Sequence, residues 1–494
     1  MKTAKLIAKN ALFLSAGKGL GDLCTFIFLI YFARYFGTDF VGKYGFSMSV
    51  GGFLTVLINL GLNALMVREV SKDKAKNSTY AGNLLITQAV LAALIWLLIG
   101  LIAFVLNMNE NTKIILVFIG TYQVFYKLSV HFDAEFRAHE EMQYSAALET
   151  LHKMLILILG LGSIHLWENP ILALAVYPIS GVARFILGWV LSVSKYGWPD
   201  FEVDYPFIKG AVVKSMPFFF IALLGQFYDR LGIILLTLLQ GESASGVYLA
   251  ADRLLVSVGV GLSMLGASMF PTMSRLSHQS GREFYKLYER SIRLTVTLTL
   301  PAAALVFIVS EPIMVTLFGD GFVESVSVLT ILTWGLVLAG VNTMMNSLII
   351  VKNHEKVWVK MQLFVCLVYS AACLILIPFY SYTGLAYAKL ITQVLFAVMA
   401  YGYIRKNIHH SDMVKVTTGP VLSCIAAAGC YYVTGELTPW LTIPAVLIVL
   451  IVSLFLFKAV QFHDLVFLKN ILMNSDRSAV EDEIEQVYIE KSVP

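Results

Sequence analysis

Long apolar runs separated by short polar segments constrain this chain more than any other feature. A helix rises about 1.5 Å per residue, so about 20 apolar residues cross a hydrocarbon core about 30 Å thick. Only 14% of the residues are charged, against about 25% in soluble domains. The sequence therefore predicts an all-α, polytopic membrane protein. Its fourteen expected transmembrane helices lie at 11–33, 42–66, 82–106, 113–136, 142–165, 170–194, 208–238, 245–270, 289–310, 325–350, 357–379, 384–404, 414–434 and 441–461.

The distribution of lysine and arginine predicts the orientation of these helices. If the N-terminus lies in the cytosol, 25 of the 36 basic residues fall in cytosolic segments and three fall outside, namely Arg34, Lys43 and Lys113. Cytosolic loops carry such an excess of positive charge. We therefore expect a multi-pass protein of the inner or plasma membrane with both termini in the cytosol. The basic segment 271–293 is expected to form a cytosolic helix on the membrane surface.

A short motif occurs twice at the same place in the predicted topology. Gly37, Gly42 and Tyr44 follow the spacing GxxxxGxY, and Gly241, Gly246 and Tyr248 repeat it 204 residues later. Six helices separate the copies, which predicts two parallel repeats related by an axis along the membrane normal. We expect six-helix bundles at 1–206 and 207–410, two additional transmembrane helices at 411–461 and a cytosolic tail at 462–494.

Fourteen charged residues fall inside the expected helices. Facing lipid, each would cost about 2.5–3.5 kcal/mol, on the order of 40 kcal/mol together, whereas a fold is stable by about 5–15 kcal/mol. Most of them must therefore pair, reach an interface or line a wet cavity. The set has eight basic and six acidic members: Lys18, Lys127, Lys153, Arg184, Lys214, Arg230, Arg253, Lys389, Asp22, Asp133, Glu135, Glu149, Asp229 and Asp252.

Two acid–base doublets, Asp229-Arg230 and Asp252-Arg253, lie at a similar depth on either side of a polar turn. Neighbours on a helix point about 100° apart, so the members of a doublet cannot face each other. One interpretation is pairing across the helices, Asp229 with Arg253 or Asp252 with Arg230. The other is a cationic cavity, since the surplus of two positive charges suits an anion and arginine suits phosphate.

The remaining intramembrane charges have simpler interpretations. Lys18 with Asp22, and Glu149 with Lys153, are spaced i, i+4 and lie on one helix face. Each is either a self-neutralising pair or part of a cavity wall. Long basic side chains near helix ends are expected to extend to the interface, which applies to Lys214 and Lys389.

Other site types find no support in the sequence. The five cysteines lie in apolar runs without CxxC spacing, and the nine histidines show no metal-ligand spacing. The run Gly37 to Lys43 lacks the serine or threonine of a phosphate-binding loop. Gly17, Gly19 and Gly21 indicate close helix packing. We expect no cofactor, no metal site and no nucleic-acid partner.

Residues at scattered positions along the chain resemble those of the polysaccharide transporters. These are the oligosaccharide and O-antigen flippases of the multidrug/oligosaccharidyl-lipid/polysaccharide exporter superfamily. The resemblance covers roughly residues 5–405. It rests on Ala33 to Gly37, Gly42 to Tyr44, Leu60-Gly61, Arg68-Glu69, Pro217-Phe218, Asp229-Arg230, Gly246 to Tyr248, Ala251 to Arg253, Phe270-Pro271 and Phe318-Gly319.

The resemblance implies two six-helix bundles around a central cavity and a transporter, not an enzyme. Its implied substrate is an oligosaccharide linked through diphosphate to a polyprenyl lipid and moved to the outer leaflet. Membrane lipids, a polysaccharide polymerase and glycosyltransferases are the further candidate partners. We expect Lys18, Arg230 and Arg253 to bind the diphosphate, with Lys127, Lys153 and Arg184 as secondary candidates. Asp22, Asp229, Asp252 and Glu149 would orient these cations or couple transport to an ion.

Two transporter alternatives remain open from the sequence. A lipid II flippase has the same plan and also fourteen helices. A proton- or sodium-coupled exporter of small molecules would use an intramembrane aspartate as its coupling site. A membrane glycosyltransferase or polymerase is disfavoured, because it needs catalytic carboxylates on a large outer loop and the expected outer loops are short.

Overall fold

The computed structural model describes residues 2–257, 259, 281–409, 413–434 and 439–457, which form helices joined by short turns and loops and contain no strand. Nine helices in these ranges are long and apolar enough to cross a membrane. Two of the nine, α1 (Lys2–Leu54) and α13 (Glu355–Asn407), each cover two of the expected spans. The remaining spans correspond to α14 (Met413–Thr434), α15 (Pro439–Leu456) and the helix over residues 242–257. The prediction of an all-α, polytopic membrane protein is confirmed.

The polypeptide reverses inside α1 and α13 at single residues with positive φ. Gly37 has φ 72° and ψ −173°, a region that is open almost only to glycine. Ser381 makes the corresponding break in α13 with φ 52° and ψ −130°. The expected turns after residues 33 and 379 are therefore present, but they are tighter than the sequence suggests.

The second expected span, 42–66, is wrong as a single helix. Three pieces cover it: the end of α1, α2 (Val56–Asn59) and α3 (Leu62–Val70). Leu60 and Gly61 between them have φ 45° and 76°, which ends one helix before the next begins. Gly61 permits this break and also a close approach, since a Cβ there would lie 2.6 Å from the carbonyl oxygen of Ser215.

The next four spans agree with expectation to within a few residues. They are α4 (Asn77–Val105), α5 (Glu110–Ala138), α6 (Met142–Trp167) and α7 (Pro170–Tyr196), and a short 3₁₀ turn, η1 (Lys74–Lys76), precedes α4. Local chemistry fixes some ends. The Asn169 side chain accepts hydrogen bonds from the backbone of Ile171 and Leu172, and Pro170 occupies the first turn of α7.

The second half of the chain begins with α8 (Tyr205–Gln240), 36 residues with Pro217 inside. The helix over 242–257 follows. Next come α10 (Gly281–Ile308), α11 (Ser310–Phe318), the 3₁₀ turn η2 (Asp320–Phe322) and α12 (Ser325–Val351). The sequence did not predict α11 and η2, which are too short to span a membrane.

The expected surface helix at 271–293 is wrong over its described part. Residues 281–293 form the first turns of α10. Phe284, Leu287 and Tyr288, which gave the segment its amphipathic pattern, are buried against α12 and α13 in one apolar cluster. The apolar face therefore packs inside the protein instead of lying on lipid. Residues 271–280 lie outside the described residues.

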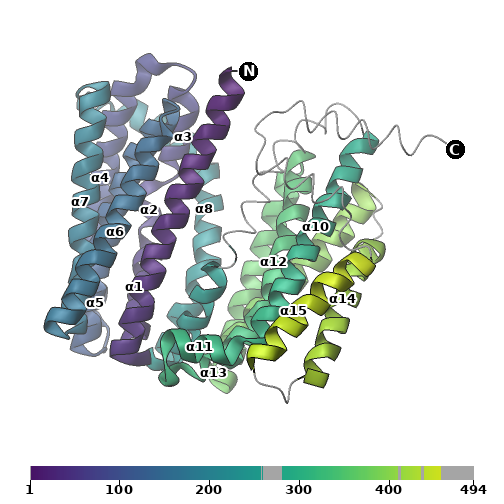
Figure 1. Cartoon of the computed structure of the whole chain (residues 1–494). Coiled ribbons are helices and arrows are strands. Elements are labelled where there is room, and N and C mark those ends of the chain that lie inside the picture. The colour runs from purple at the N-terminus through teal and green to yellow at the C-terminus, as the bar shows by residue number, and fades with distance from the viewer. Residues whose placement is uncertain (1, 258, 260–280, 410–412, 435–438, 458–494) are drawn as a thin grey trace.

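Figure 1 shows two groups of helices, α1 to α7 and α10 to α15, that lie apart at the end carrying the N-terminus and meet at the opposite end. α8 runs between them. Near its start Ser215 donates a hydrogen bond to the carbonyl oxygen of Leu60, 2.8 Å away, and the guanidinium of Arg68 lies 5.7 Å from the Phe218 ring centre. Near its end Tyr228 packs on Tyr369. α8 therefore contacts both helix groups, and Tyr228 in its second half is one of the residues that contact the second group.

An exposed ion pair lies on α3, close to the contact between α3 and α8. Arg68 Nε donates to Glu69 Oε1 at 2.8 Å, and this hydrogen bond holds the pKa of the Glu69 carboxyl below its usual range. Exposed pairs of this kind contribute little to stability. The packing of Leu60, Gly61 and Ser215 is what attaches α8 here.

Candidate functional site

The two acid–base doublets of the sequence come together between the helix groups. Asp229 and Arg230 lie on α8, and Asp252 and Arg253 lie on the helix that follows the turn at Gly241. All four lie within electrostatic range of one another. Asp229 is exposed, and the other three are partly exposed. We call these four residues, with Lys127 and Lys389, the central charge set.

The pairing inside this set differs from the prediction. Asp252 pairs with Lys389 of α13, whose Nζ lies 2.9 Å from Oδ1. Neither Asp229–Arg253 nor Asp252–Arg230 forms an ion pair. The expectation that Lys389 extends to the interface is also wrong, because its side chain is only 26% exposed and faces this carboxylate. Hydropathy places Lys389 near a helix end but does not show which face it occupies.

The guanidinium of Arg230 lies against the first helix group. A Cβ added to Gly52 of α1 would lie 3.2 Å from Nε and 3.4 Å from Cζ. Gln226, one turn earlier on α8, accepts from Nε at 3.4 Å. Lys127 of α5 lies within electrostatic range of Arg230. The central charge set thus joins α1, α5, α8, α13 and the helix over 242–257.

Three cations of the set have no carboxylate within 4.0 Å in the part of the chain that the structure describes. They are Lys127, Arg230 and Arg253, while Lys389 is paired. With four cations and two carboxylates, the set carries a formal charge of +2. Like charges in a poorly solvated region repel each other, so this arrangement favours binding of an anion, most of all one with two negative charges.

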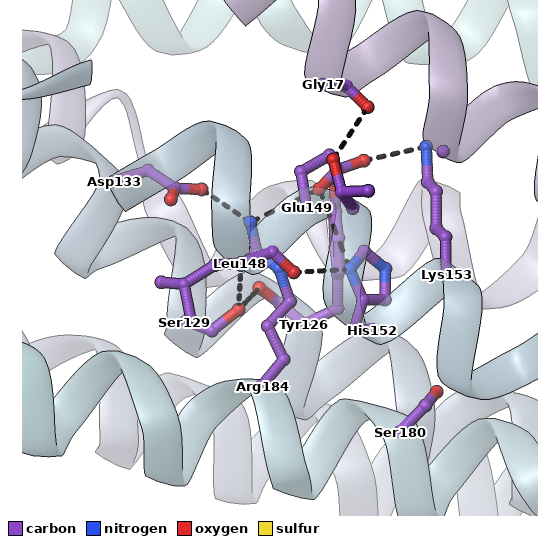
Figure 2. Close-up of polar contacts among 12 residues, drawn as sticks. Gly17, Tyr126, Ser129, Asp133, Leu148, Glu149, His152, Lys153, Ser180 and Arg184 are labelled. Atoms are coloured by element: carbon purple, nitrogen blue, oxygen red, sulfur yellow. Dashed lines mark hydrogen bonds and ion pairs between the residues drawn. The ribbon is translucent and has the colours of Figure 1, made fainter. Parts of the chain in front are cut away.

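A second charge set lies inside the first helix group (Figure 2). Lys153 Nζ of α6 contacts Asp22 Oδ1 of α1 at 2.6 Å and Glu149 Oε1 at 2.7 Å. Arg184 Nη2 of α7 contacts Glu149 Oε2 at 3.2 Å and Asp133 Oδ2 of α5 at 2.7 Å. The five side chains form one continuous chain of ion pairs, which we call the N-terminal network.

Neutral groups complete the N-terminal network. Arg184 donates a short hydrogen bond from Nη1 to the Ser129 hydroxyl, and its guanidinium lies 4.8 Å from the Tyr126 ring centre. The Tyr126 hydroxyl points at Glu149 Oε2, 3.4 Å away. His152 Nδ1 lies 3.1 Å from the Leu148 carbonyl oxygen and 3.9 Å from Glu149 Oε2. Asp133 Oδ1 is buried and has no hydrogen-bond partner among the residues that the structure describes.

The expected i, i+4 pairs have different outcomes. Glu149 pairs with Lys153 as predicted. Asp22 instead turns from Lys18 toward Lys153, and Lys18 is exposed, with no carboxylate within 4.0 Å among the described residues. Gly21 permits this contact, since a Cβ there would lie 2.6 Å from Lys153 Cδ. Close packing was predicted for Gly17, Gly19 and Gly21; it is confirmed at Gly17 and Gly21 and is wrong at Gly19, where an added Cβ would meet no described atom of a neighbouring helix within 4 Å.

The N-terminal network has three carboxylates and two cations, so it carries one surplus negative charge when all the acids are ionised. The exposed fraction of the side chain is largest at one end of the network, 34% for Asp22, and smallest for Arg184, 1%. Lys153 and Arg184 were predicted as secondary phosphate ligands. Here both are engaged by carboxylates, and Arg184 has no exposed surface to offer a ligand.

The sequence identified the charged residues of both sets, but it did not identify most of their ion-pair and hydrogen-bond partners. Asp133 and Lys389 were both recognised as intramembrane charges, but neither was given a partner. Tyr126, Ser129 and His152 carried no signal, because their roles arise only where α5, α6 and α7 meet. The only sequence signal was spacing on one face, since Tyr126, Ser129 and Asp133 follow each other at three and four residues.

The Lys389–Asp252 pair can be tested by exchanging its charges. Lys389→Met removes the only ion-pair partner of Asp252 among the described residues, and we expect loss of folded protein or of transport, because an unpaired buried charge costs about 3–5 kcal/mol. The double variant Lys389→Asp with Asp252→Lys should recover a large part of the loss. Yield of monodisperse protein measures the effect, and Lys356→Met at an exposed position of the same helix as Lys389 is the control. No recovery in the double variant would contradict the pairing.

Two known protein families match large parts of this chain. The model of the polysaccharide biosynthesis protein family matches residues 7–277, and that of the lipid II flippase MurJ matches residues 143–451. The capsular polysaccharide biosynthesis protein CapF of Staphylococcus aureus is 22% identical over 405 residues, which cover 81% of this chain and 100% of CapF.

Solved structures extend the likeness of the fold. Lipid II flippase MurJ in an inward closed conformation gives a TM-score of 0.74 at 14% identity and covers 92% of this chain and 100% of its own. An inward-facing multidrug resistance transporter of the MATE family gives 0.63 at 13% identity, with 79% and 96% covered. At these identities the likeness shows the fold alone. The model of the polysaccharide biosynthesis protein family spans more than half of the sequence, so the chain belongs to that family.

Proposed function

We propose that this protein is a flippase that moves a polyprenyl-diphosphate-linked oligosaccharide from the cytosolic to the outer leaflet by alternating access. Membership of the family supports a flippase of lipid-linked oligosaccharides. The observation that carries the finer proposal is the central charge set. It offers a formal charge of +2 and three cations without carboxylate partners, at the position where both helix groups contribute side chains.

The diphosphate is the part of the substrate that this set can recognise. Arg230 and Arg253 offer planar donor forks that match phosphate oxygens, and Lys127 adds a point charge. Arg230 touches α1 while it belongs to α8, so an anion here would contact both helix groups at once. Lys18 is exposed on α1, and we propose that it meets the anion on its way to the central charge set.

We propose that the carboxylates supply orientation and coupling. Asp252 fixes Lys389, and exposed Asp229 balances part of the cationic charge. Asp22 and Glu149 belong to the N-terminal network, whose surplus negative charge can accept one proton or another cation. An anion site between the helix groups and a cation site inside the first group would allow uptake of an ion to be linked to movement of the substrate.

We further propose that the working units are the segments 1–206 and 207–410, with 411–461 as two additional helices and 462–494 as a tail. The excess of basic residues in the expected inner loops supports the cell membrane as the location and the cytosol as the side of both termini. Glycosyltransferases would act before this step, and a polysaccharide polymerase would act after it.

A lipid II flippase is the second candidate function, because the MurJ model matches residues 143–451. Both substrates present a polyprenyl diphosphate, so the central charge set does not separate them. A coupled small-molecule exporter is less well supported, because a cationic exporter substrate would be repelled by a set with a formal charge of +2.

The test is a pair of measurements in cells that lack the protein. Surface polysaccharide and polyprenyl-linked intermediates are assayed together, and complementation with the intact gene is the control. We expect loss of surface glycan, with the intermediates retained in the inner leaflet. Growth arrest with trapped lipid II would favour the second candidate. Normal glycan, normal intermediates and normal lipid II in cells with no other flippase would contradict the proposal.

A further inference from the structure

The two copies of the GxxxxGxY motif contact each other at the end of the molecule opposite to the N-terminus. The first copy turns α1 at Gly37, and the second joins α8 to the next helix at Gly241. Both glycines have nearly the same conformation, with φ 72° and ψ −173° in one and φ 88° and ψ 174° in the other. The repeat seen in the sequence is therefore also a repeat of backbone shape.

The contact between the copies is reciprocal. A Cβ added to Gly42 would lie 1.7 Å from the carbonyl oxygen of Glu242, and one added to Gly246 would lie 1.9 Å from that of Thr38. The repeat offset of 204 residues relates Gly42 to Gly246 and Thr38 to Glu242. Each copy thus places its second glycine against the same position of the other, as in a two-fold symmetric interface.

The pseudo-two-fold axis passes close to Gly45 and Leu249, which the same offset relates. A Cβ on Gly45 would lie 2.7 Å from Leu249 Cδ2, so these equivalent residues face each other. Beside them, Thr38 Oγ1 and Ser243 Oγ share a hydrogen bond of 2.8 Å between the copies. Thr112 of α5 adds one to Glu242 at 2.9 Å.

This contact lies between the central charge set and the end of the molecule opposite to the N-terminus. Arg230 lies 11 residues before Gly241 and Arg253 lies seven after Gly246, on the two helices that leave the second copy. At about 1.5 Å per residue, the charges lie roughly 10–16 Å deeper than the contact. An anion leaving that set toward this end must therefore pass between the copies.

We infer that the reciprocal glycine contact is the gate on the side opposite to the N-terminus, and that it separates once in each transport cycle. The contact is made mostly of backbone and of two hydroxyls. Buried apolar side chains such as Val41, Val247 and Leu249 flank it, so opening must overcome the cost of hydrating them. The inference rests on the proposed function for what passes the gate, but not for whether the gate opens.

Cross-linking tests whether the gate must open. The five native cysteines are replaced, and Thr38→Cys with Ser243→Cys is introduced in the full-length protein. We expect a disulfide on oxidation, because the two hydroxyls already lie 2.8 Å apart. Oxidation should abolish glycan translocation and a reductant should restore it, while either single cysteine should have no effect. Absence of the cross-link, or translocation by the cross-linked protein, would overturn the inference.

A second readout does not depend on the substrate. Gly225 of α8 has no neighbour within 4 Å and lies one turn from Asp229 on the same face. Gly225→Cys should react with a membrane-impermeant maleimide from outside the cell only while the gate is open. Cross-linking should abolish this labelling even if the glycan assay has failed for want of the right substrate.

Substitutions of Gly42 and Gly246 should favour the open gate, whereas the cross-link keeps the gate closed. Gly42→Ala or Gly246→Ala places a methyl group against a backbone carbonyl, so we expect a severalfold increase in outside labelling of Gly225→Cys. Gly100→Ala in α4 is the matched control, because no atom lies within 4 Å of its Cβ position. Unchanged labelling in folded Gly42→Ala and Gly246→Ala proteins would contradict the gate.

Discussion

Arg184→Met should destabilise this protein by about 3–5 kcal/mol, because it leaves the buried carboxylate of Asp133 without its cation. The Arg184 side chain is 1% exposed and contacts both Asp133 and Glu149. Glu149 would keep Lys153, but Asp133 would lose its only ion-pair partner among the described residues. The loss should appear as a lower thermal midpoint and a smaller folded fraction in detergent.

A matched control lies on the same helix. Lys195 of α7 is 40% exposed and lies 3.8 Å from Glu141, and exposed pairs contribute about 0–1 kcal/mol. Lys195→Met should therefore leave the thermal midpoint almost unchanged. Adding Asp133→Asn to Arg184→Met should recover part of the stability, since the unpaired charge is then absent. Equal midpoints for Arg184→Met and Lys195→Met would show that the N-terminal network does not stabilise the fold.

The helices could be predicted because crossing a membrane depends on local sequence. Apolar length and the side on which lysine and arginine lie are both readable without knowing any neighbour. The failures occur where neighbours decide. The span at 42–66 breaks at Leu60-Gly61 because α8 packs there, and residues 281–293 enter the protein because α12 and α13 cover their apolar face.

In the candidate site, too, the features that depend on local sequence were predicted and those that depend on neighbouring helices were not. The sequence identified the intramembrane charges, since charge inside an apolar run is unmistakable. It paired Asp22 with Lys18 and left Lys389 at an interface, because the rotation of a helix about its axis depends on its partners. Lys153 and Asp22 are 131 residues apart, and Lys389 and Asp252 are 137 apart. Only the three-dimensional arrangement brings such positions together.

Arg230→Gln should weaken binding of a diphosphate by about 10- to 150-fold, because a hydrogen bond to a charged group contributes about 1.5–3 kcal/mol. The same factor is expected for Arg253→Gln. Arg230→Lys should fall between the wild type and Arg230→Gln, since it keeps the charge and loses the planar fork. Titration of the purified protein with a short-chain prenyl diphosphate measures the effect, and translocation in cells should fall in parallel.

Two comparisons separate a specific anion site from a general loss of positive charge. Lys214→Gln removes one cation from the same helix at an exposed position and should leave the diphosphate Kd unchanged. Asp229→Asn removes an acid from the central charge set and should lower the Kd, because it raises the formal charge from +2 to +3. If Asp229 also serves coupling, this variant will bind the anion more tightly and translocate it more slowly. Weaker binding by Asp229→Asn, or equal weakening by Lys214→Gln and Arg230→Gln, would place the anion elsewhere in the protein.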